Sequence, residues 1–194
     1  MRIPYAPTSP IDPTPENEAI YQRIRDRRNL RPLIPLDLAL LHNPDIADGY
    51  SKFVGAIRSK SSVPLPLAEL AICYVAVLNK ATYEWTAHAP ICLKAGTKRD
   101  VLELLLEAGS DIAAVQKASV LSEVEKLVLA FTYQSTKEIV IQEDVMEELK
   151  REFTDQQVME LTITVGAYNM VSRFLVGLDV TESNGRAMEM PKEA

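Results

Sequence analysis

The segment LPLAELAICYVAVLNK, residues 65–80, constrains the fold most strongly, because it is apolar on almost every side of the helix that it predicts. A helix without a polar face is stable in a soluble protein only when other elements surround it. Glu69 is the one charged residue in the interior of this segment. We therefore expect a central, buried helix that carries a single carboxylate into the core.

Most other segments also follow the 3.6-residue period of a helix, so the predicted fold class is all-α. Thr97 and Ser122 are expected to cap two of these helices, and Thr154 a third, with Glu125 and Gln157 completing capping boxes after the last two. The predicted helices are PLDLALLHN, DIADGYSKFVGAIRSK, a segment from about Thr82, TKRDVLELLLEAG, LSEVEKLVLAFTYQSTK, IQEDVMEELKREF and DQQVMELTITVGAYNMVSRFLVGL.

The N-terminal stretch is rich in proline, with five prolines among its first fifteen residues. Proline blocks both helix and ladder hydrogen bonds, so residues 1–35 are predicted to form an extended arm. A helical domain is expected over residues 36–180 and a C-terminal tail over residues 181–194.

Composition predicts a soluble globular protein, since 47% of the residues are apolar and 25% are charged. The net charge of −6 gives no overall attraction to nucleic acid or to an acidic membrane. The arginine-rich run RIRDRRNLR, residues 23–31, is more typical of a solvated arm or an ion-pair strip between subunits than of a nucleic-acid site.

The expected location is the cytoplasm. Cys73 and Cys92 are far apart in sequence and lie in apolar surroundings, which suits a reducing compartment and gives no disulfide framework. The N-terminus lacks an apolar signal core, and no segment is expected to be long and apolar enough to span a bilayer. No membrane partner is therefore predicted.

The stretch ATYEWTAHAP places Glu84 and His88 four residues apart, where two side chains share one face of a helix. Glu69 on the preceding buried helix needs a partner, and His88 is a natural one, directly or through water. Histidine titrates near neutral pH and a carboxylate orients it, so His88, Glu84 and Glu69 are the predicted catalytic residues. The alternative is a structural pair without catalytic work. Cys92 would follow one turn later if the helix continued through Pro90.

A polar island interrupts the final apolar helix at Tyr168, Asn169, Ser172 and Arg173. Buried polar groups require partners, and an arginine there can bind a substrate carboxylate with two hydrogen bonds or pair with Glu69. The predicted substrate-binding residues are Arg173, Tyr168, Asn169 and Trp85. A structural ion pair, with Trp85 filling the pocket, is the alternative.

Other chemistries have weaker support in the sequence. No metal site is predicted, because neither a second nearby histidine nor a metal-type cysteine spacing accompanies His88. His42, at the end of a short predicted helix, is expected to be structural. Glycine-rich phosphate loops, nucleophile elbows and dinucleotide fingerprints do not occur among the seven glycines, so no cofactor is predicted.

Two blocks of the sequence, LPLAELAICYVAVLNKATYEWTAHAPICLKAG and LTITVGAYNMVSRFLVGLDV, resemble the carboxymuconolactone decarboxylase family with the alkylhydroperoxidase D-like fold. The resemblance extends from PLDLALLHNP to about Val180. It implies an all-helical bundle that assembles into a homo-oligomer, as a dimer, trimer or hexamer.

In the peroxidase branch of that family, a glutamate on the buried helix precedes a Cys-x-x-Cys pair, and a histidine follows four residues later. The resemblance aligns Glu69 with the glutamate and His88 with the histidine, whereas Ala81 and Glu84 occupy the cysteine positions. Without these thiols no disulfide cycle can run at that site, so thiol-dependent peroxide reduction is not expected there.

The resemblance to the decarboxylase branch implies a cofactor-free lyase that acts on a small carboxylated lactone or related organic acid. Two alternatives stay open at this point. One is a cofactor-free isomerase or cyclase of secondary metabolism, and the other is a non-catalytic oligomeric scaffold, since a fold alone does not fix function.

Overall fold

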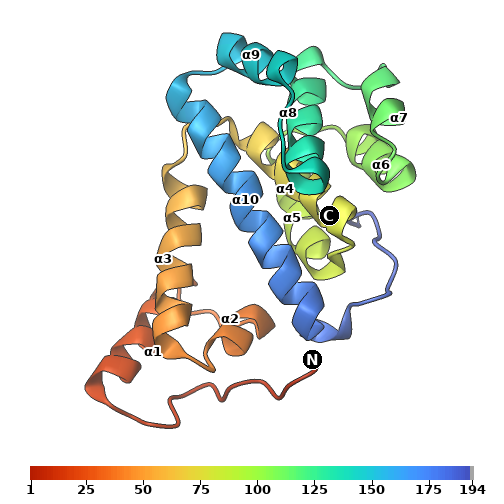
Figure 1. Ribbon diagram of the computed structural model, residues 1–194. Helices are drawn as coiled ribbons and strands as arrows, with labels where there is room; N and C mark the ends of the chain where they lie inside the picture. Colours follow the sequence, from red (N-terminus) through yellow and green to blue (C-terminus); the bar gives the residue numbers. More distant parts are fainter. Residues whose placement is uncertain (193–194) are drawn as a thin grey trace. The chain divides into compact units, whose positions relative to one another are not determined.

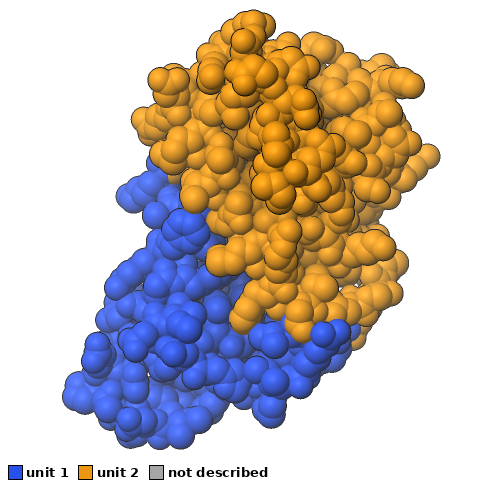
Figure 2. All heavy atoms as spheres, viewed as in Figure 1, with its two compact units in different colours: residues 1–60, 178–182 blue, residues 61–177, 183–194 orange. Residues whose placement is uncertain are grey.

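The structure, a computed structural model, describes residues 1–192, and every regular element among them is helical (Figure 1). The predicted all-α fold class is therefore confirmed. The chain divides into two compact units, which Figure 2 shows in different colours. Unit 1 contains residues 1–60 and 178–182, and unit 2 contains residues 61–177 and the C-terminal segment from Ser183. The predicted boundary near residue 35 does not match this division.

Unit 1 is built on helices near the N-terminus, so the prediction of an extended arm over residues 1–35 is wrong for much of that stretch. Thr14 caps the first helix by accepting a hydrogen bond from the backbone N–H of Asn17. Pro15 takes the first helical position, where its missing N–H would have no intrahelical partner. The helices of unit 1 are α1 (Pro15–Arg27), α2 (Pro35–Leu40), α3 (Pro44–Lys60) and the 3-10 helix η2 (Val180–Glu182).

The arginine-rich run forms ion pairs within unit 1. Arg23 binds Asp48 at 2.8 Å, while Arg27 and Arg28 lie 2.8 and 3.6 Å from the buried carboxylate of Asp37. Hydrogen bonds from Arg23 and Lys52 lower the pKa of Asp48 to about 2. These arginines therefore tie α1 to α2 and α3, and the run is not a free arm.

Unit 2 holds the remaining helices, including α7, which the sequence analysis did not predict. The capping boxes at Ser122–Glu125 and Thr154–Gln157 are confirmed. Lys98, rather than the expected Thr97, stands at the N-cap of α6. The helices of unit 2 are α4 (Leu65–Asn79), α5 (Thr82–Lys94), α6 (Arg99–Ala108), α7 (Ile112–Lys117), α8 (Glu123–Tyr133), the π-helix η1 (Gln134–Glu138), α9 (Glu143–Glu152) and α10 (Asp155–Leu178).

Helix α4 is the centre of unit 2, as its apolar sequence predicts. It packs against both α5 and α8 (Figure 1), and its residues 69–76 are all buried. The core that surrounds it includes Trp85 and Cys92 from α5, and Leu102 and Leu105 from α6. Burial of an apolar helix on all sides removes a large apolar area from water, which holds the bundle together.

Helix α10 corrects one expectation about the membrane. Its 24 residues have a mean hydropathy of 1.3 over an 18-residue window, so by length and composition it could cross a bilayer. Half of that window is buried inside the protein, and the core helix of a soluble protein meets the same criteria. By itself α10 is therefore weak evidence for a membrane span.

The predicted tail at 181–194 is divided between the two units. Its first residues lie in η2 of unit 1, and residues 183–192, which we call the C-terminal strap, run along α5. The carbonyl oxygens of Arg186 and Glu189 accept hydrogen bonds from the side chains of Thr82 and Trp85 at 3.0 and 2.8 Å. Residues 193 and 194 of the predicted tail lie outside the described residues.

The capping box of α8 gives a stability prediction. Ser122→Ala removes the hydroxyl that accepts from the backbone N–H of Glu125, and loss of such a cap typically costs about 1 kcal/mol. We expect a lower urea midpoint with an unchanged slope. Ser59→Ala, which removes a hydroxyl bonded to the Gly55 carbonyl within α3, should change the midpoint little. Equal stability of Ser122→Ala and the parent chain would contradict the prediction.

Candidate active site

The candidate site is built on the hairpin of α4 and α5. Lys80 ends α4 in the left-handed conformation, with a φ of 55°, and the backbone N–H of Ala81 donates to the Ala76 carbonyl. This tight reversal packs α5 directly against α4 (Figure 1). The hairpin therefore brings carboxylates and a histidine from two helices into one buried region.

Glu69 of α4 and His88 of α5 form a direct pair. The Nδ1 atom of His88 lies 2.7 Å from Oε2 of Glu69, and the two side chains are 9% and 3% exposed. Because a carboxylate accepts hydrogen bonds, Nδ1 carries the hydrogen in this arrangement and Nε2 is left as the nitrogen able to exchange protons. The predicted contact between Glu69 and His88 thus forms without an intervening water.

Tyr168 of α10 packs its ring against the imidazole. The two ring centroids are 4.9 Å apart and the planes are nearly perpendicular, at 85°. An edge-to-face contact of this kind restricts the rotation of both rings. Together with the hydrogen bond that His88 donates to Glu69, it fixes His88 in one orientation.

Glu84 does not pair with His88 and has a partner of its own on α10. Its Oε1 atom accepts a hydrogen bond of 2.9 Å from the hydroxyl of Ser172, and Oε2 has no hydrogen-bond partner among the described residues. The side chain is only 1% exposed. Burial raises the pKa of Glu84 well above its usual 4.5, and the hydrogen bond from Ser172 lowers it by a smaller amount.

Ser172 belongs to the polar island of α10, but it was not predicted to be a site residue. The one available signal was its position four residues after Tyr168, on the same face of α10. That spacing does not reveal which partner the hydroxyl meets on another helix.

The two cysteines of the chain also lie in this region, in contrast to their separation in sequence. Helix α5 continues through Pro90, which leaves Cys92 buried and near Cys73 of α4. Both thiols are free, and that of Cys92 donates to the hydroxyl of Thr97 at 3.2 Å. A hydrogen bond with Cys92, together with burial, raises the pKa of the Cys73 thiol, and the charges of Glu69 and Glu84 add to the effect.

Arg173 and Asn169 bind each other rather than Glu69. The Nη1 group of Arg173 donates to the backbone carbonyl and to the side-chain oxygen of Asn169, at 2.9 and 2.8 Å. Asn169 also accepts from Asn79 and donates to the hydroxyl of Thr136. The polar atoms of Asn169 are therefore occupied within the protein, while the side chain of Arg173 is exposed.

Trp85 is fully buried, and its Nε1–H donates to the carbonyl of Glu189 in the C-terminal strap. It packs in the core of unit 2 with residues of α4 and α6. Of the predicted site residues, the structure brings together Glu69, His88 and Tyr168. It places Glu84 one helical turn away, and it gives Trp85, Asn169 and Arg173 contacts elsewhere in unit 2.

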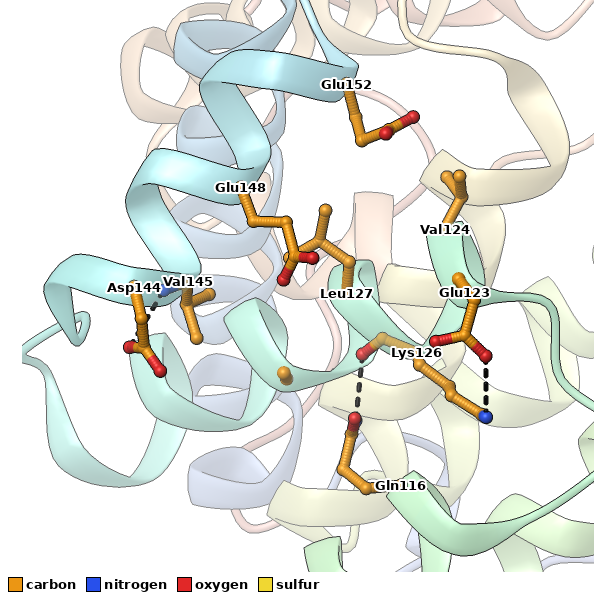
Figure 3. A pocket seen from close by; sticks show the side chains of 10 residues that line it. Gln116, Glu123, Val124, Lys126, Leu127, Asp144, Val145, Glu148 and Glu152 are labelled. Atoms are coloured by element: carbon orange, nitrogen blue, oxygen red, sulfur yellow. Dashed lines mark hydrogen bonds and ion pairs between the residues drawn. The ribbon is translucent and has the colours of Figure 1, made fainter.

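Within residues 1–192, no group of three or more histidine, cysteine, aspartate or glutamate side chains is arranged to hold a metal ion. A pocket of about 260 Å³ lies between α8 and α9 (Figure 3). Acidic side chains such as Asp144 and Glu148 line it, and it contains none of the predicted site residues.

Comparison with known proteins finds a family match over part of the chain. Residues 44–125 match the model of the carboxymuconolactone decarboxylase family, which confirms the resemblance seen in the sequence. This range includes the whole of α4 and α5, and hence Glu69, Glu84 and His88. No curated protein matches the chain.

Solved structures confirm the alkylhydroperoxidase D-like fold. An uncharacterized peroxidase-related protein from Silicibacter sp. TM1040 is 20% identical, with a TM-score of 0.69 and coverage of 91% of each chain. A protein of unknown function from Agrobacterium tumefaciens, a candidate antioxidant-defence protein AhpD, is 18% identical, with a TM-score of 0.63 and coverage of 78% of this chain and 94% of its own. A cysteine-to-alanine variant of the debrominase Bmp8, in complex with 2,3,4-tribromopyrrole, is 18% identical, with a TM-score of 0.65 and coverage of 89% of each chain.

The raised pKa of Glu84 predicts how stability depends on pH. The folded chain keeps this proton at pH values where the unfolded chain, with a pKa near 4.5, has lost it. The contribution of Glu84 is therefore fully present below about pH 4.5 and is lost as the pH rises toward the raised pKa, by about 1.4 kcal/mol per pH unit. Glu84→Gln should remove this slope, and urea unfolding from about pH 5 to about pH 8 would measure it.

Glu160→Gln is the matched control for that series. Hydrogen bonds from Gln156 and Ser62 lower the pKa of Glu160 to about 2, so its effect appears only as the pH falls below about 4.5. This variant should keep the slope of the parent chain above pH 5. If Glu84→Gln and Glu160→Gln gave the same slope as the parent, Glu84 would not be the buried acid.

Proposed function

Residues 44–125 of this chain form a carboxymuconolactone decarboxylase family segment, and we propose that the protein is a cofactor-free lyase acting through that segment. The proposed reaction removes a carboxyl group from a small carboxylated lactone or a related organic acid. Proton transfer by the side chains of the site replaces any need for an organic cofactor or a metal ion.

The buried pair of Glu69 and His88, at 2.7 Å, carries this proposal. A glutamate that holds Nδ1 of an imidazole fixes its tautomer and supports the imidazolium form, which prepares Nε2 for general acid/base work. An ion-paired glutamate inside an apolar bundle is costly, and a catalytic need explains why it is kept in this place.

The chemistry of decarboxylation indicates what the site must supply. The electron pair of the broken carbon–carbon bond passes into the conjugated carbonyl of the substrate, which produces carbon dioxide and an enolate. A proton must then reach carbon, from His88 or from Glu84, and a donor near the enolate oxygen stabilises the negative charge.

Substrate recognition is proposed for Arg173 and Tyr168. The guanidinium of Arg173 is exposed, and among the described residues it binds Asn169 through Nη1 alone. Its other nitrogens can therefore donate to the carboxylate of a substrate. Tyr168 already packs on His88 and can form one wall of the site. Of the other residues predicted to bind substrate, Asn169 enters the proposal as the partner of Arg173. The role of Trp85 in substrate binding stays a prediction.

The structural neighbours support a small cyclic substrate. A variant of the debrominase Bmp8, which has the same fold, is solved in complex with 2,3,4-tribromopyrrole, a small ring compound. The two cysteine positions of the peroxidase branch are Ala81 and Glu84 in this chain, so a thiol peroxidase cycle at those positions is not proposed. A homo-oligomer in the cytoplasm remains our proposal for its state and location.

Removal of the imidazole tests the proposed function. A panel of carboxylated lactones and related β-keto and unsaturated acids would be screened for release of carbon dioxide, with products identified by mass spectrometry. His88→Gln and Glu69→Gln should each lower kcat on the best substrate, by about 100-fold or more for His88→Gln. The helical content should stay unchanged in circular dichroism.

His42→Gln is the matched control, because His42 is the other histidine and binds the Pro4 carbonyl in unit 1. It should retain the parent activity. A product of unchanged mass would favour the isomerase or cyclase alternative. Full activity of His88→Gln would argue against the proposed acid/base role of His88. No turnover of any compound in the panel would argue against the proposed lyase and favour a scaffold.

A further inference from the structure

We propose that Ser172 is a positioning residue for Glu84, that its hydroxyl holds Oε1 so that the acidic hydrogen lies on Oε2, and that Glu84 is thereby the proton donor of the site. The catalytic meaning of this inference rests on the proposed function. The state of the carboxyl group itself does not, and it can be measured without a substrate.

The surroundings of Glu84 require the neutral acid. Its side chain is 1% exposed, and Oε2 has no hydrogen-bond partner within the described part of the chain. An ionised carboxylate in this position would keep lone pairs without donors in an apolar core, which costs several kcal/mol. Protonation removes the charge, and the raised pKa that burial causes agrees with this arrangement.

The hydroxyl of Ser172 decides which oxygen is protonated. It donates to Oε1 at 2.9 Å, and an oxygen that accepts a hydrogen bond is the carbonyl-type oxygen of a carboxylic acid. The hydrogen is therefore left on Oε2, the atom without a partner. A buried O–H without an acceptor demands an explanation, and a role as donor to a bound molecule provides one.

Helix α5 then carries two proton sites of opposite character. His88 donates a hydrogen bond to the carboxylate of Glu69. One helical turn away, Glu84 accepts a hydrogen bond from Ser172 and is held as a neutral acid. Residues four apart share a face of the helix, so both sites face the same region. Of the two, Glu84 is the group whose burial favours the protonated form.

The proposed step balances in atoms and charge. Loss of carbon dioxide leaves a carbanion-type enolate, the bond between Oε2 and hydrogen breaks, and a bond between carbon and hydrogen forms. The negative charge moves to the carboxylate of Glu84, where the hydroxyl of Ser172 stabilises it on Oε1. The carboxylate regains its proton from water after the product leaves.

Infrared difference spectroscopy with glutamate labelled by carbon-13 tests the inference. The parent chain at neutral pH should show the carbonyl stretch of a protonated glutamate, and Glu84→Gln should lack it. Ser172→Ala should shift that band to higher frequency and raise its titration midpoint, because the bond that favours the carboxylate is lost. Ser172→Thr, which keeps a hydroxyl, should restore both values.

Thr164→Ala is the matched control, since the Thr164 hydroxyl is buried on the same helix and donates to the Glu160 carbonyl within it. It should leave band and midpoint unchanged. A purely structural role for Ser172 would alter stability but neither spectroscopic value, and that result would overturn the assignment. Absence of the protonated band from the parent chain would overturn it as well.

Kinetics separate failure of this inference from failure of the proposed function. If His88→Gln abolished turnover while Glu84→Gln preserved it, the lyase would stand and the assignment of Glu84 as donor would fall. If no compound of the panel reacted and the spectroscopic results still held, the lyase proposal would fail while Ser172 would keep its effect on the protonation of Glu84.

Discussion

The bond between Glu69 and His88 is the interaction on which the site depends. Glu69 lies on the apolar helix α4, and its side chain is 3% exposed. Such a group destabilises a fold unless a partner compensates for the lost hydration. The tight turn at Lys80 and Ala81 supplies that partner, because it packs α5 directly against α4. The geometry of a short turn thus decides whether a buried carboxylate can be tolerated.

The two buried polar side chains of α5, His88 and Glu84, have partners on different helices, and these partners give them different chemical surroundings. His88 meets a carboxylate from α4, whereas Glu84 meets a hydroxyl from α10. The Nδ1 atom of His88 lies beside a carboxylate, whereas burial raises the pKa of Glu84 beside a neutral hydroxyl. Neighbouring turns of one helix therefore hold groups in different electrostatic surroundings. The difference arises from their partners, since both side chains are almost fully buried.

Much of the fold could be predicted from the sequence, because apolar periodicity and capping residues act locally. The central position of α4 follows from its composition, and the Ser122 capping box is confirmed. Helix α1 was not predicted, since clustered prolines suggested an extended arm. Its first proline instead occupies the one helical position where proline is favoured. The arginine-rich run was interpreted as a solvated arm or an ion-pair strip between subunits, and the sequence did not reveal its ion pairs with Asp37 and Asp48.

Side-chain partners across the bundle could be predicted only in part. The pairing of Glu69 with His88 was foreseeable, because a buried charge needs a partner and the chain has only two histidines. The partner of Glu84 was not, because the sequence does not state which turn of α10 faces α5. For Arg173 the sequence suggested a substrate carboxylate or Glu69 as the acceptor. In the structure its guanidinium contacts oxygens of Asn169, which the sequence did not indicate.

The C-terminal strap is bound to α5 and α6 through its backbone carbonyls. Thr82, Trp85 and Arg99 all donate to main-chain carbonyls of the strap, and such carbonyls are present whatever side chains the strap carries. Most residue identities in the strap are therefore free to change, whereas its length is constrained. Met188 and Met190 are exceptions, because they pack on the core. Insertion or deletion of one residue between these carbonyls would shift the later ones away from their donors on α5 and α6. In this segment, spacing rather than residue identity holds the structural information.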